Sequence, residues 1–234
     1  MKLMSKTLDT SVLEEKIKIV FKDKQLLQTA FVHRSYLNEH AGFPLPSNEK
    51  LEFLGDSVLS LITSEHLYRN YPDHQEGDYT DIKAAVVNTA SLYAAAKELN
   101  LGKYLHLSKG EQENNGRENV SILADCFEAL LGAIYLEKGF KTSYTFVTTF
   151  LFKDTLDTII RKKLYLPAKN VLQEYYQDRY KKLPRYQVLN ESGPEHNKQY
   201  EIGVYDDEKL LAKGQGKSKK LAEEEAARKA LQKL

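Results

Sequence analysis

An acidic stretch at residues 48–61 is the part of this chain best suited to chemistry. If it is helical, Glu49, Glu52 and Asp56 share one narrow face, opposite the apolar positions. None of these acids has a lysine or arginine within this face, so they repel one another unless a cation lies between them. Phe53 lies beside the acids, where it is exposed unless a partner covers it. A solvated acidic surface and a metal or catalytic site both explain this pattern.

A second acidic pair, Asp125 and Glu128, lies three residues apart in an almost wholly apolar segment, residues 120–138. The composition of this segment predicts that both carboxylates are buried. A buried carboxylate pair without basic neighbours is costly unless it is protonated or binds a cation. The pair therefore favours a metal site over a structural accident.

The chemistry of these acids follows from their donor atoms. Carboxylate oxygens gathered without histidine or cysteine suit Mg²⁺ or Mn²⁺ rather than zinc. Such ions activate water and neutralise charge at a phosphodiester during in-line displacement. The chain contains no Walker loop, GxSxG elbow or HExxH motif. The acids therefore favour phosphodiester hydrolysis.

Helices must position these residues, and the sequence predicts a mainly α fold. Apolar periodicity predicts an all-helical first domain over residues 1–161. The expected helices cover residues 9–19, 25–37, 48–69, 79–99, 120–138 and 141–163, with a loop at 108–119. Gly132 and Ala133 would let a second helix approach closely, and the helix at 48–69 is the natural candidate.

The C-terminal region differs in pattern and in charge. After a linker at 162–166, residues 167–234 predict a domain of α-β-β-β-α order. Its elements are a helix at 167–180, strands at 185–190, 199–205 and 209–213, and a helix at 217–234. Residues 161–234 carry 17 Lys and Arg against 11 Asp and Glu, a net charge of +6, which leaves −5 for residues 1–160. A basic module beside an acidic one suggests that one holds a polyanion and the other handles a metal.

The composition also predicts the compartment. One cysteine, Cys126, excludes an internal disulfide framework and fits a reducing cytoplasm. It lies in an apolar segment, which favours a buried, inert thiol over a nucleophile. No stretch reaches the length of apolar sequence that a membrane span needs. We expect a cytoplasmic protein without membrane contact.

Several motifs resemble one known family. Residues 48–59 read NEKLEFLGDSVL, which closely resembles the signature of bacterial ribonuclease III. The segment HRS at 33–35 precedes it, and the segments EGD at 76–78 and SILADCFEAL at 121–130 come after it, which is the order found in the family. The segments LQEY at 172–175, GPEH at 193–196 and GQGKSKK at 214–220 resemble a double-stranded-RNA-binding domain.

The resemblance implies an endoribonuclease that cuts both strands of duplex RNA and leaves 5′-phosphate and 3′-hydroxyl ends, with roles in rRNA-precursor and mRNA processing. By position, Glu52, Asp125 and Glu128 match the family's ligands for Mg²⁺, for which Mn²⁺ can substitute. Asp56 and Glu128 match its catalytic residues, with Asp56 holding water that includes the attacking molecule. His33, within the HRS segment, is more readily explained as structural and stays outside this set.

The resemblance also implies a homodimer with one active site in each subunit. Glu49 and Glu76 match acids that help to place the scissile strand, partly across the subunit boundary. Phe53 matches an aromatic residue that fills a pocket of the other subunit, which would explain its position among the acids.

The basic tail has features suited to A-form RNA, which proteins recognise through minor-groove 2′-hydroxyls and through phosphates. One helix face and one turn supply candidates for contact with 2′-hydroxyls, namely Gln173, Glu174, Gln177 and His196. Lys217, Lys219 and Lys220 begin a helix after two glycines, where cations and helix dipole together favour phosphate. A lysine run is otherwise more often a solvated surface.

Two other functions are compatible with the sequence. A module could bind double-stranded RNA without cutting it, although a pure binder has no need of Glu52, Asp56, Asp125 and Glu128 together. A metal-dependent phosphohydrolase of small nucleotides has no need of the basic tail.

Overall fold

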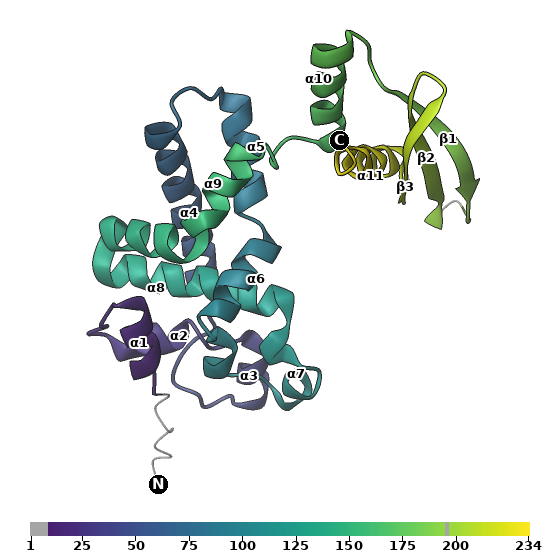
Figure 1. Ribbon diagram of the computed structural model, residues 1–234. Helices are drawn as coiled ribbons and strands as arrows, with labels where there is room; N and C mark the ends of the chain where they lie inside the picture. The colour runs from purple at the N-terminus through teal and green to yellow at the C-terminus, as the bar shows by residue number, and fades with distance from the viewer. Residues whose placement is uncertain (1–8, 195–196) are drawn as a thin grey trace. The chain divides into compact units, whose positions relative to one another are not determined.

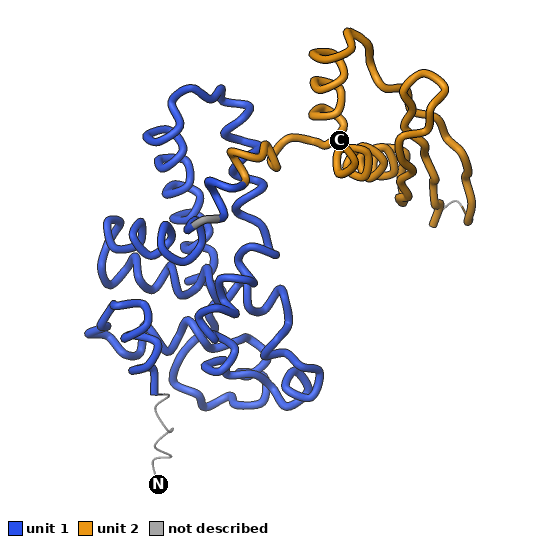
Figure 2. Tube along the Cα trace, in the orientation of Figure 1, with its two compact units in different colours: residues 1–158 blue, residues 159–234 orange. Residues whose placement is uncertain are grey.

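The computed structural model describes residues 9–194 and 197–234, and its fold is mainly α, as predicted. The chain divides into two units, residues 1–158 and residues 159–234 (Figure 2). The described part of the first unit is helical, and in the second unit helices pack on a sheet. The unit boundary lies near the predicted linker, and the domain bounds 1–161 and 167–234 stay a prediction.

The first unit is built from helices of unequal length (Figure 1). They are α1 (Ser11–Ile17), α2 (Lys24–Thr29), α3 (Arg34–Glu39), α4 (Glu49–Asn70), α5 (Glu76–Val86), α6 (Thr89–Glu98), α7 (Lys109–Glu113), α8 (Val120–Val147) and α9 (Lys153–Arg161), which continues into the second unit. Two short 3-10 helices, η1 (Leu101–Tyr104) and η2 (Gly116–Glu118), and a π-helical turn, η3 (Thr148–Phe152), connect them.

The core of this unit lies where α4 packs against α8. Leu59 and Ile62 of α4 and Phe127 and Leu130 of α8 are completely buried. Each of these side chains contributes about 1.5–3 kcal/mol by leaving water. The two helices that carry the acidic residues are thus also the two that hold the unit together.

The predicted helix at 25–37 is instead two helices, α2 and α3. Val32, between them, forms a parallel bridge with His106, and the N–H of His33 donates to the carbonyl oxygen of His106 at 3.1 Å. These contacts join segments far apart in the sequence, so helical periodicity gives no sign of them. They end α2 and place His33 at the start of α3.

The predicted helix at 79–99 is also two helices, α5 and α6. The side chain of Asn88 accepts a hydrogen bond from the N–H of Ser91 at 3.0 Å and caps α6. Asparagine is a preferred N-cap residue, so the break had a signal in the sequence. Within the loop expected at 108–119, the short helices α7 and η2 form.

The second unit has the predicted α-β-β-β-α order. It contains α10 (Ala168–Tyr180), β1 (Arg185–Ser192), β2 (Gln199–Asp206), β3 (Lys209–Gly216) and α11 (Lys219–Leu231). The strands form an antiparallel sheet in the order β1-β2-β3, with Arg185 opposite Tyr205 and Tyr200 opposite Gly216. Both helices share one buried core with the sheet, made of Leu172, Tyr176, Val204, Ala212, Ala226, Ala227 and Ala230.

Candidate active site

Two glycines let α4 and α8 cross with their backbones in contact. A Cβ atom on Gly55 would lie 1.8 Å from the carbonyl oxygen of Glu128, and one on Gly132 would lie 2.2 Å from that of Leu51. Both distances are far below van der Waals contact, so a larger residue would force the helices apart. The close approach predicted from Gly132 is confirmed, and it brings Glu52 of α4 beside the acids of α8.

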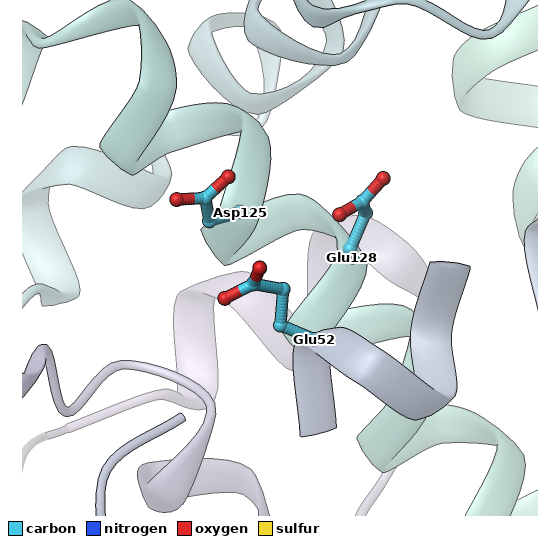
Figure 3. Close-up of side chains that lie close together, drawn as sticks. All are labelled: Glu52, Asp125 and Glu128. Carbon is cyan, nitrogen blue, oxygen red and sulfur yellow. The ribbon is translucent and has the colours of Figure 1, made fainter. Parts of the chain in front are cut away.

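Three carboxylates meet at this crossing (Figure 3). One carboxylate oxygen from each of Glu52, Asp125 and Glu128 lies within 4.8 Å of the other two. We call these three residues the acidic triad. The burial predicted for Asp125 and Glu128 is only partial, because α8 turns Cys126 and Phe127 toward the core instead. Partial burial leaves the carboxylates open to a ligand.

The protein environment disfavours negative charge in the acidic triad. Burial, followed by the charges of Asp56, Asp125 and Glu52, raises the pKa of Glu128 to about 7. Burial, followed by the charges of Asp125 and Glu49, raises the pKa of Glu52 as well, and burial raises that of Asp125. A divalent cation among these oxygens would reverse the repulsion, so ionisation and cation binding are coupled.

The other predicted acids lie outside the triad. Asp56 is exposed one turn after Glu52, and its charge reaches Glu128. Glu49 is exposed and accepts a hydrogen bond from Ser47 Oγ at 2.8 Å. Glu76 begins α5 and is exposed. Within the described residues of one chain, the structure brings together only part of the predicted acidic set.

Phe53 lies on the exposed side of α4, as the sequence predicted. It is 78% exposed, a large value for an aromatic side chain. Leu61 and Tyr68 on the same helix are also exposed, at 58% and 75%. Covering exposed apolar side chains of this kind with a partner surface would lower the free energy.

Most of the predicted RNA contacts in the tail lie on the surface of the second unit. Gln173, Glu174 and Gln177 are exposed on α10, and Glu174 pairs with Lys163 at 3.4 Å. His196 lies outside the described residues.

The lysines of the tail surround the start of α11. Lys217, Lys219 and Lys220 are exposed, and Ser218 caps the helix by accepting from the N–H of Leu221 at 3.3 Å. The predicted start of this helix was therefore two residues early, and Lys217 precedes it. Lys219 Nζ lies 5.8 Å from the centre of the Tyr200 ring.

Basic residues near the acids were missed in the sequence, because they come from α3. Arg34 Nη1 lies 3.7 Å from Glu49 Oε1, so the acidic face of α4 has one cationic partner. Burial raises the pKa of Asp125, and a protonated His33 ring would oppose this by lowering it. The HRS segment at 33–35 was recognisable in the sequence. Its distance along the chain does not indicate that it lies beside α4 and α8.

Among the described residues, no helix is long and apolar enough to cross a membrane.

The structure joins a helical unit that carries an acidic triad to an α-β-β-β-α unit with exposed lysines, and comparisons with known proteins identify both units. Residues 23–155 match the Ribonuclease-III-like family model, and residues 168–234 match the double-stranded RNA binding motif. Ribonuclease 3 of Oceanobacillus iheyensis is 45% identical over 96% of this chain and 97% of its own length. Ribonuclease 3 of Natranaerobius thermophilus is 44% identical over 97% and 96%.

A solved structure is similar as well. The nuclease domain of ribonuclease III from Campylobacter jejuni is 39% identical, covering 63% of this chain and 99% of that chain, with a TM-score of 0.58. That structure is described as showing flexibility in a region involved in dimer formation. The chain belongs to the ribonuclease III family. It is an endoribonuclease of this type with a double-stranded-RNA-binding domain.

Proposed function

We propose that the chain hydrolyses phosphodiester bonds in both strands of double-stranded RNA, in a Mg²⁺-dependent reaction that leaves 5′-phosphate and 3′-hydroxyl ends. The acidic triad of Glu52, Asp125 and Glu128 is the observation that carries this proposal. Burial raises the pKa of all three carboxyl groups, and neighbouring acids raise those of Glu52 and Glu128 further, so a divalent cation would stabilise the ionised triad. Processing of rRNA precursors and mRNA is the proposed cellular role.

The donor atoms of the triad fit a hard cation. Glu52, Asp125 and Glu128 would hold Mg²⁺, for which Mn²⁺ can substitute, because all three offer only carboxylate oxygen. When bound, such an ion would supply charge neutralisation at the phosphate and a more acidic water. Asp56 is proposed to hold the attacking water, whose oxygen bonds to phosphorus. The water loses a proton as its oxygen bonds to phosphorus, the bond from phosphorus to the 3′ oxygen breaks, and the 3′ oxygen takes up a proton. One water is thus divided between the 5′-phosphate and the 3′-hydroxyl.

A homodimer is proposed, in which each subunit cuts one strand. The exposed ring of Phe53 supports this, since a pocket of the partner would remove its apolar surface from water. The related C. jejuni domain is described as having a region involved in dimer formation. Glu49 and Glu76, which lie outside the triad, are proposed to place the scissile strand, partly across the subunit boundary.

The basic tail is proposed to hold the duplex. Gln173, Glu174 and Gln177 on one exposed face of α10 suit contact with 2′-hydroxyls. Lys217, Lys219 and Lys220 are exposed around the start of α11, where they suit phosphates. His196 remains a proposed minor-groove contact from the sequence.

The cytoplasm is the proposed compartment. Cys126 is a buried free thiol and the only cysteine of the chain, which fits a reducing environment.

Incubation of the protein with a long RNA duplex tests this function. In Mg²⁺, the duplex should be cut into short duplex fragments with 5′-phosphates, and EDTA should stop the reaction. Glu128→Gln should bind the duplex about as well as the original protein and fail to cut it. Glu15→Gln is the matched control, because Glu15 is exposed on α1, away from the triad.

The same experiment separates the alternatives. If the protein binds the duplex tightly but leaves it uncut in both Mg²⁺ and Mn²⁺, the nuclease proposal is rejected. The protein would then be a double-stranded-RNA binder without cleavage activity. Full cleavage by Glu128→Gln would reject the assigned role of the triad.

A further inference from the structure

His33 is the N-cap residue of α3, and the sequence alone gave it no catalytic role. Its side chain is half-buried, and its backbone N–H donates to the carbonyl oxygen of His106 at 3.1 Å. That bond lies next to the bridge between Val32 and His106, so two distant segments fix the backbone of His33. A ring on such a backbone is held in place before any substrate arrives.

Hydrogen bonds on one side of the ring select its tautomer. The N–H of Ser35 donates to His33 Nδ1 at 3.3 Å, which requires a lone pair on that nitrogen. Ser35 Oγ accepts from the N–H of Ser108 at 3.2 Å and lies 2.8 Å from Nδ1, so its own proton is free to point at Nδ1. Nδ1 is therefore an acceptor, and the proton of the neutral ring is on Nε2.

The other side of the ring is open. Among the described residues, Nε2 of His33 has no hydrogen-bond partner. Nε2 is also not among the buried atoms that lack a partner, so a ligand can reach it. Burial lowers the pKa of His33, and so does the charge of Arg34, against the opposing charges of Glu111, Asp125 and Glu49. The lone pair on Nδ1 leaves the ring neutral, with a free N–H at Nε2. The carbonyl oxygen of Val32, just before His33, accepts from the N–H of Asn48 at 2.8 Å, so the backbone of His33 lies beside the start of α4. A charge on the ring would act on Asp125.

We propose that His33 donates its Nε2–H to a phosphate oxygen of the RNA strand that is being cut. The inference rests on the proposed function, because a strand whose phosphate reaches the triad must pass Asp125. No carboxylate accepts from Nε2 among the described residues, so the donor is left for a ligand. A donor fixed in advance stabilises charge on the phosphate without reorganisation.

Two amide substitutions test this assignment in the full chain. His33→Asn keeps an acceptor near the position of Nδ1 and preserves the cap of α3, but it removes the distant donor. His33→Gln places an N–H near the position of Nε2 and loses the cap. Single-turnover cleavage of duplex RNA in saturating Mg²⁺ should slow about 10- to 100-fold in His33→Asn, and His33→Gln should recover most of this loss.

A merely structural His33 gives the opposite order, with His33→Asn active and His33→Gln impaired. That order, or full activity in both variants, would overturn the proposal. His40→Gln, an exposed histidine at the end of α3, is the control and should cleave normally. Thermal melting of each variant identifies any loss of folding. Ser35→Ala removes one hydrogen bond to Nδ1 of His33 and should slow cleavage less than His33→Asn does. An inactive original protein would instead reject the proposed function itself.

Discussion

Replacing Glu128 by glutamine should make the metal-free protein more stable at pH 8. Burial and the charges of neighbouring acids raise the pKa of Glu128 from 4.5 to about 7. A raised carboxyl pKa means that the folded state holds the proton more tightly than the unfolded state. Its cost to the fold is therefore absent at acidic pH, grows between pH 4.5 and pH 7, and is complete above pH 7.

The magnitude follows from the size of this shift. Each pKa unit corresponds to about 1.4 kcal/mol, so ionisation of Glu128 costs about 3 kcal/mol at pH 8 as an upper limit. For a domain of this size, each kcal/mol shifts the melting temperature by about 2–4 °C. Because solvent reaches part of this side chain and screens its charge, about 12 °C is the upper limit of the increase. Glu128→Gln should therefore melt several degrees above the original protein at pH 8, and much closer to it at pH 5.

Circular dichroism melts in EDTA at both pH values measure this difference. Adding Mg²⁺ at pH 8 should raise the melting temperature of the original protein more than that of Glu128→Gln, because the ion needs the carboxylate. Glu15→Gln should change neither result. Equal melting of Glu128→Gln and the original protein at pH 8 would refute the claim that the fold opposes this charge.

Three further variants test other parts of the structure. Phe53→Ala should shift the protein toward monomer in sedimentation, and a fully dimeric variant would show that Phe53 is not the contact. Lys219→Ala with Lys220→Ala should weaken duplex binding and reduce the slope of log affinity against log salt by about 2, whereas an unchanged slope would exclude phosphate contact. Gly55→Ala should lower the melting temperature by several degrees, because its Cβ would lie 1.8 Å from a backbone oxygen of Glu128; unaltered melting would mean that the helices separate freely.

The predictable parts of the fold are those with local signals. The helix that became α4 has an apolar face opposite its acids, the one that became α8 is almost wholly apolar over many residues, and the second unit alternates in a way typical of strands. Acid spacings of three and four residues placed Glu52 and Asp56 on one face, and Asp125 and Glu128 on another. Gly132 then indicated which two helices meet.

The missed features depend on contacts between distant residues. Val32 interrupts a helical pattern because it pairs with His106, and neither residue carries a local sign of this. The ion pair of Arg34 with Glu49 likewise joins α3 to α4. The break at Asn88 is different, because asparagine is a preferred N-cap residue and its side chain caps α6.

The backbone contact at Gly55 and Gly132 has a consequence for how this kind of protein can change. Because main-chain atoms set the spacing of α4 and α8, the scaffold keeps its shape whatever side chains occupy the triad. Exchanging carboxylates for amides relieves repulsion, so a chain that loses its reaction gains stability. A few substitutions in the triad would therefore convert such a protein into one that keeps its duplex-binding surface and no longer cleaves. Only continued selection for cleavage keeps the acids in place.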